Sequence, residues 1–210
     1  MAEPAPRLIP RRLILGGLAL AGTRPRAAWA APPEIRFRVM REGSAIGTHR
    51  VSFRDTAGGL AARTEVDIAV RLLGITVFRY THRFEEIWAG NRLRAVTSRT
   101  DRNGRVTEAT IRAEGGGLVV NGPEGTQRLP AEAAPLSWWD PGRFDQRPLF
   151  DANTGRLLRV QWRREALPGG VTRWHAGGEA EGEGRYAADG TWLDWRTRGE
   201  DGSTVTYERA

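Results

Sequence analysis

The longest regular pattern in the chain is an alternation of side-chain character over the thirteen residues 60 to 72. The even-numbered positions of this run are Leu60, Ala62, Thr64, Val66, Ile68, Val70 and Leu72. The odd-numbered positions include Arg63, Glu65, Asp67 and Arg71. Because successive side chains of a strand point to opposite faces of a sheet, the pattern predicts a long antiparallel strand with one buried face and one wet face.

The chain has other extended runs, and turn sequences separate them. The runs cover residues 35–39, 75–88, 92–100, 105–113, 157–165, 171–176, 191–198 and 203–208. Asn-Gly and Asp-Gly steps at 103–104, 189–190 and 201–202 are typical of hairpins. No stretch from residue 31 onward has a convincing helical period. The sequence predicts an all-β fold, an antiparallel meander of about ten strands that forms a strongly curved sheet or a barrel-like single domain over residues 31–210.

One segment interrupts this rhythm. Residues 130–155 read PAEAAPLSWWDPGRFDQRPLFDANTG, with prolines at four positions and large side chains that include Trp138, Trp139, Phe144, Leu149 and Phe150. A connection this long and this aromatic is uncommon inside a compact domain, and it favours a lid, a binding loop or a plug over an open core. The alternative is a loop whose aromatic side chains cap the end of the sheet.

The N-terminus has the features of an export signal. Arginines precede an apolar run at residues 13–22, which is too short to span a membrane, and an Ala-Trp-Ala pattern ends at Ala30, before Ala31. We expect residues 1–30 to be cleaved between Ala30 and Ala31, leaving a periplasmic or secreted protein without a transmembrane segment. The pair Arg11-Arg12 resembles a twin-arginine signal, and the general secretory route also fits. An N-terminal anchor or tail is the alternative.

The cysteine content and the charge pattern argue against cysteine-based sites and against nucleic-acid binding. The chain contains no cysteine, which excludes disulfides, thiolate metal sites and cysteine nucleophiles. Residues 1–30 carry five arginines and one glutamate, so their removal lowers the net charge from +7 to +3. The remaining arginines alternate with acids along the strands, whereas nucleic-acid binders gather basic charge in a stripe. We therefore expect no nucleic-acid partner.

The sequence FRYTHRFEEIW at residues 78–88 places two ionisable groups on an aromatic face. Tyr80, His82 and Glu86 share that strand face with Phe78, Phe84 and Trp88. His49 lies on a similar apolar face with Val51 and Phe53. Scattered polar groups among aromatic side chains suit the concave wall of a cavity for an amphipathic ligand. We therefore predict ligand contacts from Tyr80, His82, Glu86 and His49, with Trp138, Trp139 and Asp140 in the lid or rim. The alternative is that each histidine is partly buried and paired locally, for example with Glu86 or Tyr80.

Motifs for catalysis are missing from the sequence. There is no nucleophile elbow, no phosphate-binding loop and no pair of histidines at a metal-ligand spacing. We predict no catalytic residues, no metal and no cofactor. A hydrolase or metal-dependent enzyme built on His49, His82, His175 and the aspartates of the 130–155 segment is the less favoured alternative. A structural envelope protein that presents a sheet edge or a tryptophan surface to a partner is another.

Several short motifs resemble a known family. They are IGTHRVSF, FRYTHRFEEIWAGNRL, TSRTDRNG, SWWDP, FDANTG, DGTW and DGSTVTY, and they extend from about Phe37 to Tyr207. This set resembles an exported bacterial β-rich family known only as a domain of unknown function. The resemblance implies export and a β architecture, and it supplies no catalytic residues. Residues 177–185, GGEAEGEGR, depart from the pattern and predict a flexible loop.

These observations favour an exported, non-catalytic binding module for a lipid-like or amphipathic small molecule. An envelope component is the other expected partner.

Overall fold

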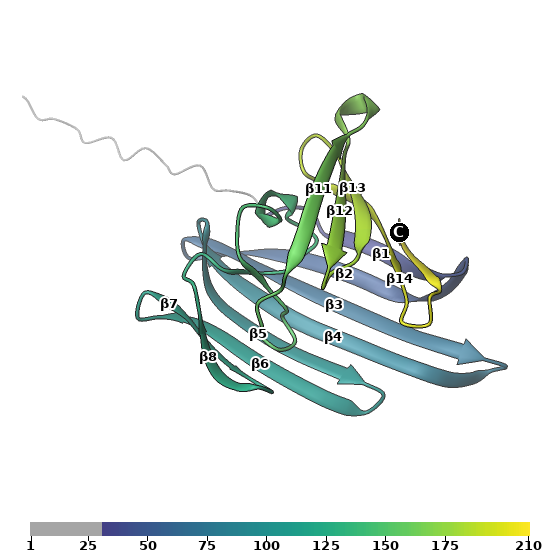
Figure 1. Cartoon of the computed structure of the whole chain (residues 1–210), viewed down its shortest axis with the longest axis horizontal. Coiled ribbons are helices and arrows are strands. Elements are labelled where there is room, and N and C mark those ends of the chain that lie inside the picture. Colours follow the sequence, from purple (N-terminus) through teal and green to yellow (C-terminus); the bar gives the residue numbers. More distant parts are fainter. Residues whose placement is uncertain (1–30) are drawn as a thin grey trace, which may run out of the picture.

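The computed structural model describes residues 31–210, so the predicted signal segment and Ala30 lie outside the described part of the chain. Most of the described chain forms one antiparallel sheet of thirteen strands (Figure 1). Its first eight strands are β1 (Ile35–Arg41), β2 (Ser44–Thr56), β3 (Gly59–Leu72), β4 (Ile75–Ala89), β5 (Arg92–Arg102), β6 (Arg105–Glu114), β7 (Gly117–Gly122) and β8 (Gly125–Leu129). The other five are β11 (Val160–Ala166), β12 (Thr172–Gly178), β13 (Gly182–Tyr186), β14 (Trp192–Arg198) and β15 (Thr204–Arg209).

The order of strands in the sheet differs from their order in the chain. The sheet runs β11-β12-β13-β14-β15-β1-β2-β3-β4-β5-β6-β7-β8, so its two edges are β11 and β8. The last strand, β15, pairs with the first strand, β1, in the middle of the sheet, with Phe37 opposite Arg209. The chain therefore starts in the middle, reaches one edge at β8, crosses to the other edge and returns.

The crossing between the two edges is made by residues 130–159, which we call the plug segment. It contains a short parallel pair, β9 (Ala134–Pro135) with β10 (Leu149–Phe150), and a 3₁₀ turn, η1 (Pro141–Arg143). A second 3₁₀ turn, η2 (Pro168–Gly170), joins β11 to β12. None of the helical segments described in residues 31–210 is long and apolar enough to cross a membrane.

The sheet bends until distant strands approach each other. Arg102 at the end of β5 forms an ion pair with Glu200 in the turn between β14 and β15, although several strands separate these elements in the sheet. Figure 1 shows β11–β14 standing over the long strands β2–β6. The predicted all-β, strongly curved architecture is confirmed, and β8 and β11 do not pair, so the curved sheet stays open at these edges.

The plug segment fills the space inside the bend and belongs to both halves of the core. Ala133, Ala134, Leu149 and Phe150 pack with the side chains of β4–β8. Phe144 packs with β1, β2 and the β12–β14 strands, with its ring stacked on Trp162 at 4.3 Å between centroids. The prolines keep the plug segment out of the main sheet, and its aromatic and aliphatic side chains are buried beneath that sheet.

Two details of the sequence-based prediction need correction. The main sheet has more strands than the predicted ten or so, because the short strands β7, β8 and β13 lack a clear alternation. Residues 177–185, predicted to be a flexible loop, contain β13. A Cβ atom on Gly182 or Gly184 would lie 2.5 Å or 2.4 Å from the indole of Trp195. The glycines that suggested a loop therefore make room for a tryptophan on a neighbouring strand.

Candidate ligand cavity

The register of three strands brings two buried histidines into one row. His49 on β2 is opposite Val66 on β3, and Val66 is opposite His82 on β4. Neighbouring strands lie roughly 4.8 Å apart, so the backbones of the two histidines are about 10 Å apart. Both side chains are buried on the inner face of the sheet, as the alternation around each of them predicts.

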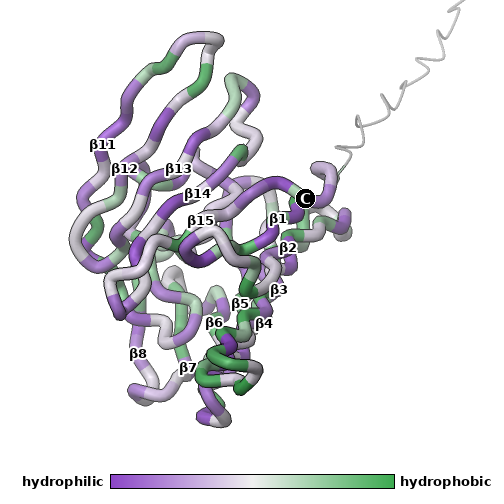
Figure 2. The backbone as a smooth tube through the Cα atoms, turned by 90° about the vertical axis from the view of Figure 1, so that its right-hand side faces the viewer, coloured by the Kyte–Doolittle hydropathy of each residue, from purple (hydrophilic) through white to green (hydrophobic). Residues whose placement is uncertain are grey.

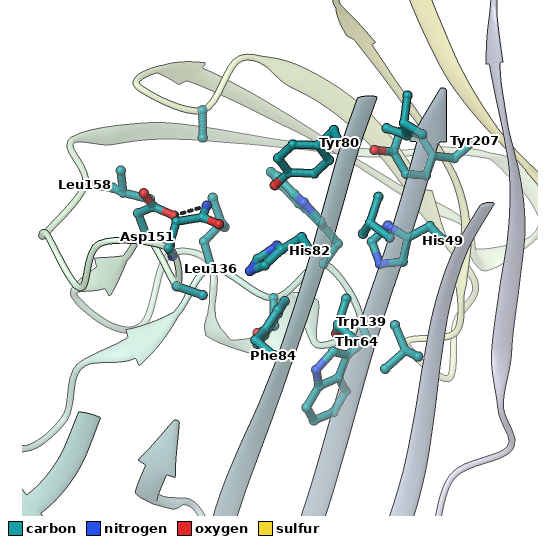
Figure 3. A pocket seen from close by; sticks show the side chains of 18 of the residues that line it. His49, Thr64, Tyr80, His82, Phe84, Leu136, Trp139, Asp151, Leu158 and Tyr207 are labelled. Carbon is teal, nitrogen blue, oxygen red and sulfur yellow. Dashed lines mark hydrogen bonds between the residues drawn. The ribbon is translucent and has the colours of Figure 1, made fainter. Parts of the chain in front are cut away.

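A cavity of about 390 Å³ lies between this inner face and the plug segment (Figure 3). Its sheet side is formed by His49, Val51, Thr64, Val66, Ile68, Tyr80, His82, Phe84 and Tyr207. Its other side is formed by Leu136, Ser137, Trp138, Trp139, Asp151, Ala152, Asn153, Arg156, Leu158, Glu179 and Ala180. Arg156 and Glu179 are exposed and form an ion pair at 2.6 Å, so they mark the side on which the cavity meets solvent.

His49 is a neutral, incompletely paired group in this wall. Burial, together with the nearby His82, lowers the pKa of His49 from 6.5 to about 3. The ring lies edge-on to Trp192 and Tyr207, with centroids 5.2 Å and 5.5 Å away. Its Nδ1 atom is buried and has no hydrogen-bond partner among the described residues. A buried polar atom without a partner is unfavourable, so this ring edge is suited to a bound polar group.

His82 is also neutral at physiological pH, but it has a protein partner. Burial lowers its pKa from 6.5 to about 4, although the carboxylate of Asp151 opposes this shift. Its Nε2 atom shares a hydrogen bond of 3.1 Å with Ser98 Oγ on β5, and its ring stacks on Phe84 at 4.8 Å. His82 is therefore held in a fixed orientation at the cavity wall.

A second polar group comes from two tyrosines and the end of the plug segment. Burial raises the pKa of Tyr207 to about 12, and burial with the nearby Tyr207 and Asp151 raises the pKa of Tyr80. Asp151 accepts hydrogen bonds from the backbone N–H and the side-chain amide of Asn153, at 2.9 Å and 2.7 Å. Figure 3 shows Tyr80 and Tyr207 on one side of the histidines and Phe84 and Trp139 on the other. Because their pKa values are raised, the hydroxyl groups of Tyr80 and Tyr207 are neutral at physiological pH.

Glu86 belongs to a different site, although it shares the strand face of Tyr80 and His82. It is fully buried and is not among the residues that line the cavity. Its carboxylate accepts hydrogen bonds from Trp88 Nε1 at 2.8 Å, Trp139 Nε1 at 3.1 Å and Ser137 Oγ. Burial raises the pKa of Glu86, and these donors together with Arg143 oppose that shift. Three plug and sheet donors thus fix Glu86 as an anchor for the plug segment.

Arg143 completes the anchor. Its Nη1 atom lies 3.7 Å from Glu86 Oε2, and its guanidinium is stacked 3.6 Å from the ring centroid of Trp88. Its Nη2 atom forms an ion pair of 2.8 Å with Asp140, which also caps η1 by accepting from the N–H of Gly142. Asp140 therefore contacts the anchor and lies outside the cavity lining, in contrast to the contact predicted for it.

The structure brings together His49, Tyr80, His82, Trp138 and Trp139, five of the residues predicted to contact a ligand. It adds Tyr207 and Ser137, which sequence reasoning did not place in the site, and Asp151, which the sequence analysis named only in the enzyme alternative. Arg143 is added in the anchor. The FDANTG motif at residues 150–155 was a signal for Asp151 and Asn153, because an Asp-x-Asn turn points polar groups back into the fold. No sequence pattern identified Arg143 as the partner of Glu86.

The third histidine lies elsewhere. His175 on β12 faces Glu165 on β11 and Glu183 on β13, at 3.5 Å and 3.4 Å, and does not line the cavity. Within residues 31–210 there is no group of three or more histidine, aspartate or glutamate side chains that could hold a metal ion. His175 therefore lies outside the cavity that His49 and His82 line.

One solved structure supports the fold. A crystal structure described as a β-barrel-like protein of the domain of unknown function DUF1849 from Brucella abortus is similar, with a TM-score of 0.55 and 12% sequence identity, over 84% of this chain and 94% of that chain. A DUF1089 family protein from Pseudomonas aeruginosa aligns with a TM-score of 0.43 and 14% identity, over 89% of this chain and 96% of that chain.

A search of curated proteins gave no match. The family comparison does give one, and it covers residues 37–210, nearly the whole of the described sheet. The chain therefore belongs to the family described as domain of unknown function (DUF6134).

Proposed function

We propose that the chain is an exported, non-catalytic binding module that holds a lipid-like or other amphipathic molecule between the curved sheet and the plug segment. The observation that carries this proposal is the cavity of about 390 Å³, whose walls combine aliphatic and aromatic side chains with a similar number of polar or ionisable ones. Small-molecule sites in proteins typically enclose roughly 300–1,000 Å³. Export and a periplasmic location are proposed from the signal-like residues 1–30.

The polar groups of the cavity favour an uncharged head group. His49 and His82 are neutral at pH 7 because their pKa values are lowered to about 3 and about 4. The carboxylate of Asp151 would repel an anion, and its oxygens already accept hydrogen bonds from Asn153 and Thr154. A hydroxyl or amide head group could pair with His49 Nδ1, while its apolar part contacts Val51, Val66 and Phe84.

Native mass spectrometry of the protein purified gently from the cell envelope tests the proposal. We expect a bound small molecule that dissociates on denaturation and partitions into organic solvent. Binding of a fluorescent fatty-acid amide should then be measured on the emptied protein, because this probe has an apolar chain and an uncharged head.

Two matched variants connect the binding to the cavity. Ile68→Trp places an indole in the cavity wall, whereas Ala69→Trp adds the same ring to the opposite face of β3. We expect Ile68→Trp to weaken probe binding at least about tenfold, which corresponds to losing roughly 1.4 kcal/mol, and Ala69→Trp to leave it unchanged. Equal binding by both variants, or a wild-type protein that binds neither a native molecule nor the probe, would contradict the proposal.

An interaction with an envelope component is the second candidate function. One observation favours it, the exposed apolar end of the β3–β4 hairpin, and that feature is independent of the cavity.

A further inference from the structure

The end of the β3–β4 hairpin exposes apolar side chains to solvent. We call residues 72–77 the hairpin tip. Leu72, Ile75 and Val77 are each more than half exposed, and Leu73 is 96% exposed. The hairpin projects beyond the rest of the sheet in Figure 1, and Figure 2, seen from that side, shows its end as a hydrophobic stretch. Single exposed apolar residues are ordinary, but four within one turn form a patch that marks an interaction site.

The backbone of the tip makes its leucine more unusual. Leu73 and Gly74 form a two-residue turn with φ angles of 49° and 83°. Such turns need positive φ at both positions and therefore strongly prefer Asn-Gly or Asp-Gly. The neighbouring β5–β6 hairpin has this preferred pair, Asn103-Gly104, with φ angles of 53° and 87°. Leucine at position 73 is thus unfavourable in two ways: its backbone has a positive φ, and its apolar side chain is exposed to water. The β5–β6 turn of the same chain has asparagine, Asn103, at the equivalent position.

Basic side chains surround the tip. Residues 68–84 contain Arg71, Arg79 and Arg83 and no aspartate or glutamate. Arg71 and Arg79 are exposed and form no ion pair within residues 31–210, whereas Arg83 pairs with Asp67. Asn103 exchanges hydrogen bonds with the backbone of Arg79, so the β5–β6 turn and its exposed Arg105 lie beside Arg79, behind the tip. The patch is therefore apolar at its end and positively charged behind it.

We propose that the hairpin tip inserts into the surface of a bilayer that contains anionic phospholipids. The apolar side chains would enter the boundary between head groups and acyl chains, and Arg71, Arg79 and Arg105 would contact the phosphates. Apolar burial together with attraction of basic residues to anionic lipid is the usual basis of interfacial binding. A second copy of the chain fits the tip less well, because a symmetric contact would bring the arginines of both copies together.

The absence of cysteine allows a position-specific test. Thr76→Cys places a single thiol in the tip and keeps its four apolar residues, and Asn91→Cys places one beyond the other end of β4. A strand of fifteen residues separates these sites by roughly 50 Å. Each full-length variant is labelled with an environment-sensitive fluorophore and mixed with vesicles of phosphatidylcholine or of phosphatidylcholine with about 30% phosphatidylglycerol. Some vesicles carry a quencher on the acyl chains.

We expect the label at position 76 to shift to the blue and be quenched in the anionic vesicles, and the label at position 91 to stay in water. Apparent affinity should be at least about tenfold higher for the anionic vesicles and fall with added salt. Leu73→Asn in the Thr76→Cys background should weaken insertion about tenfold or more, because a leucine side chain no longer enters the apolar layer.

Three results would overturn the proposal. The first is a label at position 76 that stays in water with both vesicle types. The second is equal quenching at positions 76 and 91, which would mean that the whole molecule adsorbs without a preferred end. The third is a blue shift at position 76 that depends on protein concentration and not on vesicles, which would assign the tip to a contact between copies of the chain.

Discussion

The two ends of the β3–β4 hairpin reverse the usual distribution of polar and apolar groups. At one end, the carboxylate of Glu86 is fully buried beside Trp88. At the other end, Leu73 is almost fully exposed between Leu72 and Ile75. Both ends belong to the same pair of strands, and His82 and Tyr80 lie between them.

The difference follows from what lies over each end. The plug segment covers the buried end and supplies Ser137, Trp139 and Arg143, which pair with Glu86. A buried charge is tolerated only with such partners. The hairpin tip extends beyond the other strands (Figure 1), so its apolar side chains have no cover within the described chain. The difference in burial between the two ends of the hairpin therefore follows from the cover that the plug segment provides.

The largest effect on stability is expected at the buried end of the hairpin, around Glu86. Arg143→Met should lower the free energy of unfolding by about 3–5 kcal/mol, because it leaves the carboxylate of Glu86 without its cationic partner. Urea denaturation followed by tryptophan fluorescence measures this change. Arg99→Ala, which breaks the exposed pair with Glu108, is the control and should change stability by about 1 kcal/mol or less. A loss below about 1 kcal/mol in Arg143→Met would show that the anchor does not hold the plug segment.

The stability of the row formed by His49 on β2 and His82 in the middle of the hairpin should respond to acid. The pKa values of His49 and His82 are lowered in the folded state, so below pH 6.5 the unfolded chain binds protons that the folded chain does not. Stability should therefore fall as pH falls from 6.5 towards about 4, by up to about 1.4 kcal/mol per pH unit for each histidine.

The measurement is a set of urea denaturation curves between pH 7 and pH 5. His49→Phe removes one of the two titrating groups and should roughly halve the slope below pH 6.5. An unchanged slope in this variant would mean that His49 is protonated in the folded protein.

The smallest effect on stability is expected at the exposed end of the hairpin, where the substitution should stabilise the protein. Leu73→Asn should raise the free energy of unfolding by a few tenths to about 1 kcal/mol, because asparagine tolerates the left-handed conformation better than leucine. Asn103→Leu makes the reverse exchange in the neighbouring turn and should destabilise the protein. If Leu73→Asn is destabilising instead, Leu73 makes a contact in the folded chain, and its exposure no longer argues for an external binding partner.

Sequence reasoning works well where a pattern is local. The alternation at residues 60–72 predicts β3 to within a residue of its bounds, Gly59–Leu72, and the inward orientation of His49 and His82 follows from their neighbours in the chain. The glycines of β13 wrongly suggest a loop. They make room for the indole of Trp195 on the neighbouring strand, and this contact cannot be read from the local sequence.

The anchor could not be predicted, because it depends on pairing between distant segments. Glu86 and Arg143 are separated by the whole of β5–β8, and nothing in either local sequence identifies the other. The same holds for Tyr207, which reaches the cavity only because β15 returns to the middle of the sheet.

The pairing of β15 with β1 has a consequence for how the protein is made. Until Thr204–Arg209 emerges from the ribosome, β1 has an open edge and the two halves of the sheet have no strand between them. Pairing β1 with β15 is a contact of very high sequence separation, and such contacts form slowly. The two halves of the sheet are therefore joined only after β15 has been made, and removal of Thr204–Arg209 would leave two half-sheets without hydrogen bonds between them.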